Sequence, residues 1–278
     1  MEAIILSRRD WREYDQIISV YTKDHGKLEL LARGVKKIVS KLSAQLEPFS
    51  YVMLAVVPGK EIHHLTTAQP LSIFPNIRSN LEKMLAAQMV IAVADRLIQG
   101  GQKDSRLFAL IKSWLAHVEK TQIFRWLLVD SFFLSLLALL GFSPILDRCV
   151  LCAKTFRAMV KEELSLPSVV RPSRTKEGLY FAGGGLICSS CRITKEKIGE
   201  EIIDCGLKEA SDLQILRKGD WRMVERFALG DTETWQIHRL VMAFATYHTE
   251  RKLPDWTTLT PYVIVASSMQ QTVNNNNA

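Results

Sequence analysis

The first part of the chain carries short apolar runs that are rich in aromatic and β-branched residues. Turn residues such as Asp24-His25-Gly26 and Pro58-Gly59 separate these runs. Several closely spaced runs of this kind predict strands of a small barrel. We expect five strands, at residues 3–6, 16–21, 27–31, 49–57 and 62–67.

From about residue 79 the apolar residues recur at helical spacing. Ser79 or Asn80 is a plausible cap for a first helix, which Gly100-Gly101 should end. A second helix should begin after Asp104 or Ser105.

A third helix is predicted over residues 122–140, followed by Gly141 as a C-cap and by Pro144. Because this segment is apolar on nearly all sides, other helices should surround it. Its apolar run is interrupted by Arg125 and Asp130, and the part after Asp130 is too short to span a bilayer.

Residues 145–195 break the helical pattern with four cysteines, two prolines and three consecutive glycines. Helices resume after about residue 205, with an amphipathic stripe that follows Asp231-Thr232. We therefore predict an α+β protein with a five-stranded barrel over 1–78 and an α-helical domain over 79–265. A cysteine module is inserted in that domain at about 145–195, and residues 266–278 should form a disordered tail.

The 278 residues carry a formal net charge of +7 and a pI of about 9.2. A positive chain favours polyanionic partners, although a solvated basic face explains the same charge. The start of the chain lacks the pattern of a secretory signal. We therefore expect a cytoplasmic protein without a membrane anchor, in which thiols stay reduced and paired cysteines bind metal.

Two C-x2-C pairs, Cys149 with Cys152 and Cys188 with Cys191, have the spacing of zinc knuckles. Two intervening residues let both thiolates of a pair face one ion, and two pairs complete a tetrahedral shell. Because four thiolates leave no open position for substrate, we expect one structural Zn²⁺. The alternative is two reduced or oxidised pairs. Cys205 stands alone and is expected in the core.

A zinc deaminase has a similar order of residues, with H-x-E before P-C-x-x-C. Here His117 and Glu119 precede Cys149, but residue 148 is arginine, not proline. The deaminase interpretation also leaves the second cysteine pair unexplained. We expect no catalytic residue and no enzymatic activity.

Basic residues with nearby aromatic side chains concentrate in the barrel region. Positive grooves hold nucleic-acid phosphates, and aromatic rings stack on the bases of single strands. The alternative is a solvated loop, with Trp11 and Tyr14 packed into the barrel. Segment 33–41 has no acidic residue and is the stronger candidate. The candidate nucleic-acid-binding residues are Arg33, Lys36, Lys37 and Lys41, together with Lys23, Lys27, Arg8 and Arg9.

The chain resembles the RecO family of bacterial recombination mediators. The N-terminal motifs are YTKDHGKL at 21–28, ARG at 32–34, SKL at 40–42 and LEPF at 46–49. The motifs of the cysteine module are GFSPILDRCVLC at 141–152 and FAGGGLICSSC at 181–191.

The resemblance implies an N-terminal OB-fold and a helical domain with a zinc module. It implies binding of single- and double-stranded DNA, annealing of complementary strands, and a cytoplasmic, nucleoid-associated location. It also implies partnership with RecR, contact with the single-strand-binding protein SSB, and help in loading RecA. A zinc-stabilised protein–protein adaptor with incidental DNA affinity is the alternative.

Overall fold

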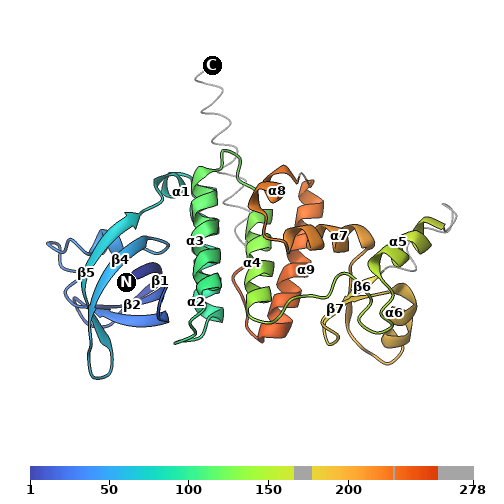
Figure 1. The fold of residues 1–278 in the computed structure, drawn as a ribbon, viewed down its shortest axis with the longest axis horizontal. Helices are drawn as coiled ribbons and strands as arrows, with labels where there is room; N and C mark the ends of the chain where they lie inside the picture. Colours follow the sequence, from blue (N-terminus) through green and yellow to red (C-terminus); the bar gives the residue numbers. More distant parts are fainter. Residues whose placement is uncertain (166–176, 228, 256–278) are drawn as a thin grey trace, which may run out of the picture. The chain divides into compact units, whose positions relative to one another are not determined.

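The computed structural model describes residues 1–165, 177–227 and 229–255 (Figure 1). The described residues form two compact units, the first with residues 1–124 and 254–255 and the second with residues 125–253. The first unit contains the barrel and helices α1 (Pro75–Ser79), α2 (Leu81–Leu97) and α3 (Ser105–Lys120), whereas the sequence pattern predicts these helices in one domain with the later ones. The predicted tail at 266–278 lies outside the described residues.

Five strands close into a barrel in the order β1-β2-β3-β5-β4. Neighbouring strands are antiparallel except β3 and β5, which pair in parallel at Leu30 and His63. This barrel confirms the predicted N-terminal fold. Its strands are β1 (Glu2–Asp10), β2 (Gln16–Thr22), β3 (Gly26–Ala32), β4 (Tyr51–Val57) and β5 (His63–Ser72), and a 3-10 turn spans Ser43–Leu46.

Alternate residues of the strands fill the barrel, among them Ala3 and Ile5 on β1 and Ile18 and Val20 on β2. The residues between them are buried as well, because α2 packs against β1 in the same unit. This double burial explains why residues 3–6 of β1 are all apolar. Helices α1 (Pro75–Ser79), α2 (Leu81–Leu97) and α3 (Ser105–Lys120) complete the unit.

The N-cap residues of α2 and α3 are among those that the sequence predicts. Asn80 accepts the N–H of Lys83 at 3.0 Å, and Asp104 accepts the N–H of Arg106 at 2.8 Å. Tyr21 on β2 contacts the loop between α2 and α3. Its hydroxyl lies 3.1 Å from the carbonyl oxygens of Gln102 and Asp104.

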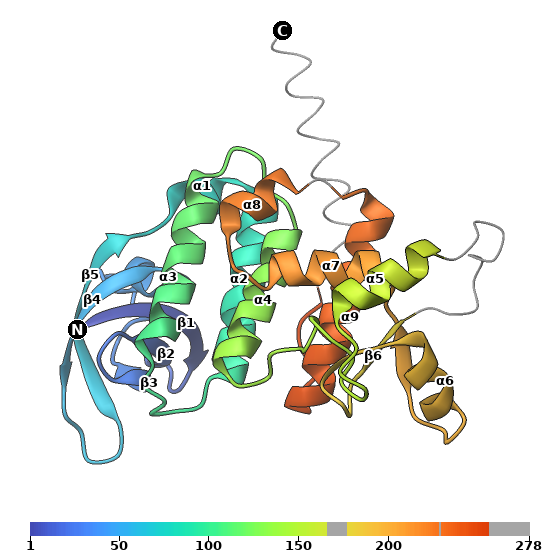
Figure 2. The ribbon, with the colours of Figure 1, turned by 45° about the vertical axis from the view of Figure 1, so that its right-hand side comes forward.

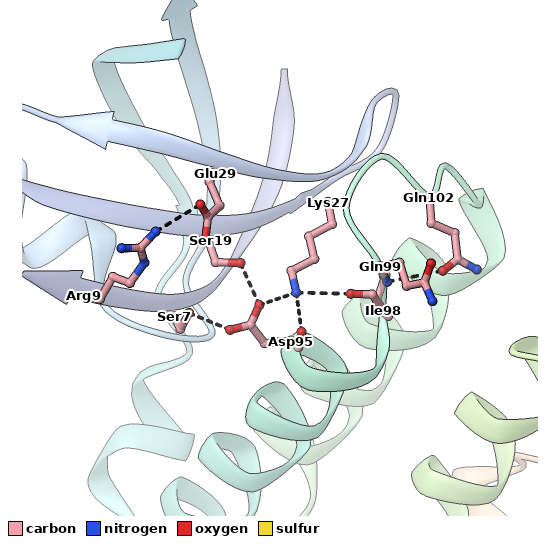
Figure 3. A network of polar contacts seen from close by, with 9 residues as sticks. All are labelled: Ser7, Arg9, Ser19, Lys27, Glu29, Asp95, Ile98, Gln99 and Gln102. Atoms are coloured by element: carbon pink, nitrogen blue, oxygen red, sulfur yellow. Dashed lines mark hydrogen bonds and ion pairs between the residues drawn. The ribbon is translucent and has the colours of Figure 1, made fainter. Parts of the chain in front are cut away.

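A partly buried carboxylate joins the barrel to α2, as Figure 3 shows. Asp95 accepts the hydroxyls of Ser7 at 2.6 Å and Ser19 at 2.7 Å, and Lys27 Nζ lies 2.9 Å from its Oδ1. Lys27 also donates to the backbone carbonyls of Asp95 and Ile98. Burial raises the pKa of Asp95, but these hydrogen bonds outweigh burial and leave that pKa lowered.

Asp95→Asn should therefore destabilise the first unit at neutral pH by about 2 kcal/mol, because charge-assisted hydrogen bonds are lost. A folded pKa below the unfolded value gives stability above pH ~3.9 that is lost as the pH falls through the folded pKa. Urea unfolding at pH 7 and pH 3 should thus show a smaller difference between the two proteins in acid. Glu29→Gln, which removes the exposed Arg9–Glu29 pair of Figure 3, is the control and should change little. An Asp95 effect of equal size at both pH values would contradict this role.

The second unit is built around α4 (Leu127–Leu139), which contacts α7 (Leu207–Leu216), α8 (Trp221–Arg226) and α9 (Asp231–Thr249). This confirms the expectation that other helices surround the apolar segment. Helix α4 begins at Leu127 rather than at 122, because residues 121–126 form a connecting loop in which Ile123 is exposed. Asp130, which interrupts the apolar run, is fully buried and pairs with His238 of α9 at 2.6 Å.

The cysteine module contains α5 (Phe156–Ser165) and α6 (Ser189–Glu196), which are labelled in Figure 2. It also contains a three-stranded sheet in the order β7-β6-β8. The strands are β6 (Gly178–Tyr180), β7 (Gly185–Ile187) and β8 (Ile202–Asp204). Because β8 pairs with β6, the module extends to Asp204, beyond the predicted end near 195. Within the described ranges, no helix combines the length and the apolarity needed to cross a bilayer.

Candidate metal centre and nucleic-acid interface

Four sulfur atoms meet in the inserted module. The Sγ atoms of Cys149, Cys152, Cys188 and Cys191 all lie within 4.8 Å of one another. Cys152 Sγ and Cys188 Sγ are 3.7 Å apart. Zn–S bonds of about 2.3 Å at tetrahedral angles place sulfurs about 3.8 Å apart, so the cluster has the size of a four-thiolate metal site.

Backbone pairing between two distant segments brings the cysteines together. Ile145 donates its N–H to the carbonyl of Gly184 at 3.0 Å and accepts the N–H of Leu186 at 2.7 Å. Val150 then donates to the carbonyl of Leu186 at 2.8 Å. The segment before the second cysteine pair therefore runs alongside the first pair.

Each cysteine pair lies in a tight local structure. The first pair is closed by a turn in which Ala153 donates to the carbonyl of Cys149 at 3.0 Å, with Ala153 at φ 58°. The second pair brackets the start of α6, with Cys188 as its N-cap residue. Two intervening residues thus suffice to aim both sulfurs of a pair at one point, as the spacing predicts.

Backbone N–H groups already stabilise negative charge on one sulfur. Burial raises the pKa of Cys149, but the N–H groups of Cys152, Cys188 and Leu151 more than offset it and lower that pKa to about 7. Burial and the neighbouring sulfurs raise the pKa of Cys188 and of Cys191. Four thiolates in this space need a cation between them, so these residues fit a bound metal ion.

The remaining cysteine does not belong to the cluster. Cys205 follows β8 and is buried, and burial raises the pKa of its thiol. It has the position expected of a small core residue. The four clustered sulfurs fill a tetrahedral shell without it.

Gly185 should be required for this arrangement, because a Cβ added there would lie 2.2 Å from the carbonyl oxygen of Ile145. We expect Gly185→Ala to separate the two cysteine pairs and to lower both the bound metal and the melting temperature. Gly100→Ala, where no atom lies within 4 Å of the added Cβ, is the matched control. Metal analysis and thermal unfolding measure the two effects. Full metal retention by Gly185→Ala would show that the close approach is not needed.

Glu119 of the alternative deaminase motif has a different role. Glu119 on α3 accepts the backbone N–H groups of Asn76 and Ile77, each at 3.0 Å. Its carboxylate thus satisfies amide groups at the start of α1. The four cysteines form their cluster without His117 or Glu119.

The loop that joins β3 to β4 carries the strongest of the predicted nucleic-acid-binding positions. Arg33, Lys36, Lys37 and Lys41 are all exposed on it. Lys36 pairs with Asp10 at 2.6 Å, and Lys37 Nζ lies 5.7 Å from the ring centre of Tyr14. The loop can therefore offer several cations to one phosphate backbone.

Three of the other predicted cations, like Lys36, are paired with carboxylates of the same unit. Arg8 pairs with Glu47 at 2.8 Å, Arg9 with Glu29 at 3.1 Å, and Lys23 with Glu2 at 3.6 Å. These side chains remain partly or well exposed.

The prediction that Lys27 binds nucleic acid is wrong. Its ammonium is largely buried against Asp95 and two backbone carbonyls, so it serves the joint between the barrel and α2 rather than a surface.

Several exposed side chains near the loop were not among the predicted site residues. Trp11 and Tyr14 are 52% and 46% exposed, so they are not packed into the barrel as the alternative interpretation required. Ile38 and Val39 are also exposed, between the loop cations. An apolar pair flanked by lysines is the sequence signal that could have identified them. Such side chains can contact the faces of nucleic-acid bases.

Comparison with known proteins covers nearly the whole chain. The family model described as "Recombination protein O N terminal" matches residues 1–74, and "Recombination protein O C terminal" matches residues 78–257. The chain is 25% identical over 251 residues to "DNA repair protein RecO" of Thermoanaerobacter sp. (strain X514), which covers 90% of this chain and 92% of that protein.

Two further relatives with the same name align over a shorter part. The RecO of Syntrophomonas wolfei is 30% identical over 189 residues, which is 68% of each chain. The RecO of Rubrobacter xylanophilus is 31% identical over 191 residues, which is 68% of this chain and 69% of that protein. With a closed barrel, a helical unit and a four-cysteine module in the order that both family models span, the chain belongs to the RecO family.

Proposed function

We propose that this protein is a non-enzymatic mediator of DNA repair and recombination that binds single- and double-stranded DNA and anneals complementary strands. The observation that carries the proposal is the exposed basic loop of the barrel, with Arg33, Lys36, Lys37 and Lys41. Family membership and the relatives' name support the DNA-repair role.

Annealing needs no chemistry from the protein. Two complementary strands repel each other through their phosphates, and cations from one loop lower this repulsion when both strands are near. The bases then pair by themselves. Because the loop offers charge rather than base-specific contacts, binding should depend little on sequence.

The four cysteines are proposed to hold one Zn²⁺ as scaffold. Thiolate ligands in a closed tetrahedral shell favour zinc and leave no position for water or substrate. When bound, the ion supplies coordination energy to the fold. The residues of the module position the sulfurs, and the nucleic-acid contacts are assigned to the barrel.

The proposed partners are RecR and SSB, with a functional link to RecA, in the bacterial cytoplasm at the nucleoid. An annealing assay with SSB-coated complementary strands, with and without RecR, tests the mediator role. We expect this protein to accelerate duplex formation on coated strands. Annealing no faster than the spontaneous rate would contradict the proposal.

A zinc-stabilised adaptor is the second candidate, and the closed cysteine site and the helical second unit favour it. Titration with labelled single strands at near-physiological salt separates the two candidates. Micromolar or weaker DNA binding, beside tight binding of a protein partner, would favour the adaptor.

A further inference from the structure

A pocket of about 440 Å³ lies in the barrel unit beside the basic loop. The turn between β1 and β2 forms one wall with residues 12–15, and Arg33, Gly34 and Lys37 form the other. This volume is within the range of sites that hold small organic groups. Arg33 and Lys37 are also loop cations, but phosphate contacts by these two side chains leave the cavity itself without a ligand.

Hydrogen bonds between the two walls hold the pocket in shape. Asp15 Oδ1 accepts the N–H of Gly34 at 2.8 Å, and the carbonyl of Tyr14 accepts the N–H of Lys36 at 3.1 Å. Gly34 has φ 64°, a conformation that glycine adopts without strain. The Lys36–Asp10 ion pair joins the same two segments again. The pocket is therefore formed before any ligand arrives.

The lining of the pocket carries charges of both signs. Arg12, Glu13 and Asp15 lie on one wall, and Arg33 and Lys37 lie on the other, which leaves an excess of one positive charge. A phosphate site would be lined by cations and amide groups without nearby carboxylates. Carboxylate oxygens instead accept hydrogen bonds from the amino groups of bases.

The aromatic ring of the lining is available to a ligand. Tyr14 is 46% exposed, and Lys37 Nζ lies 5.7 Å from its ring centre. Trp11, three residues earlier, is 52% exposed with the Arg9 guanidinium 5.9 Å from its ring. Aromatic rings beside cations are the surface on which unpaired bases stack.

We infer that the pocket binds an unpaired nucleobase of a single strand, stacked on Tyr14, and so separates single strands from duplexes. This rests on the proposed function, because the loop cations must first hold the strand. Bases within a duplex are stacked and paired, so their faces are not accessible to the pocket. The loop cations contact phosphates of both forms, whereas the pocket adds affinity for single strands alone.

The test compares Tyr14→Ala with Tyr14→Phe, which keeps the ring. Three probes are titrated at one salt concentration: a single strand, a duplex, and a single strand with an abasic tract. We expect Tyr14→Ala to weaken single-strand binding roughly tenfold, while Tyr14→Phe stays near wild type. Duplex affinity should be unchanged in both variants, and the abasic strand should bind wild type and Tyr14→Ala equally.

Equal weakening of strand and duplex binding by Tyr14→Ala, or no weakening of single-strand binding, would overturn the base pocket. Melting temperatures equal to wild type exclude a folding defect as the cause of lost binding. Failure of the proposed function looks different, since wild type would then bind none of the three DNA probes.

Discussion

Cys149→Ser should release the metal and unfold the inserted module. Apparent binding energies of structural zinc reach about 10–16 kcal/mol in zinc-finger peptides, and a whole domain is stable by only about 5–15 kcal/mol. The described part of the module is a three-stranded sheet and two short helices around the four sulfurs, so little else can replace the ion. Metal analysis should show one ion in wild type and none in the variant, with a lower melting temperature.

Cys205→Ala is the matched control for this change. It removes a buried sulfur just after β8, outside the cluster, and should keep the metal. DNA binding by Cys149→Ser should fall only as far as the protein unfolds, because the basic loop belongs to the other unit. A stable, metal-free Cys149→Ser protein that has lost DNA binding alone would assign the nucleic-acid contact to the module.

Removing the four loop cations together should abolish most DNA affinity. Each phosphate neutralised on a single strand contributes about 0.7 to the slope of log affinity against log salt. Four lost contacts should therefore weaken binding on the order of a hundredfold at 0.15 M salt. Fluorescence anisotropy of labelled strands measures the loss for the variant with alanine at Arg33, Lys36, Lys37 and Lys41.

A second variant with the same change in net charge controls for long-range attraction. It replaces four exposed cations of the second unit with alanine and should retain most of the affinity. Similar losses in the two variants would indicate a general effect of net charge rather than a site on the loop. The four control positions are Lys161, Lys197, Lys218 and Arg222.

The barrel and the cysteine cluster could be predicted because their signals are local. Turn residues delimit the five strands, and two intervening residues fix the geometry of each cysteine pair. The caps Asn80 and Asp104 could also be predicted, because each is a single polar residue just before a helical pattern.

Side-chain roles that depend on distant partners could not be predicted. Lys27 looks like a surface cation in the sequence, but its partner Asp95 lies 68 residues later, on α2. Tyr14 forms a pocket wall only because Asp15 binds Gly34, 19 residues away. Glu119 likewise caps a helix more than forty residues earlier in the chain. Long-range pairing of this kind leaves no periodic signal along the sequence.

The salt dependence of single-strand affinity tests most directly whether the barrel loop is the DNA-binding element. Affinity should be measured between about 50 and 200 mM salt for wild type and for the variant without the four loop cations. We predict that the variant's slope is shallower by roughly 3, the value expected for four lost phosphate contacts on a single strand. Equal slopes for the two proteins would contradict the account and place the phosphate contacts elsewhere on the chain.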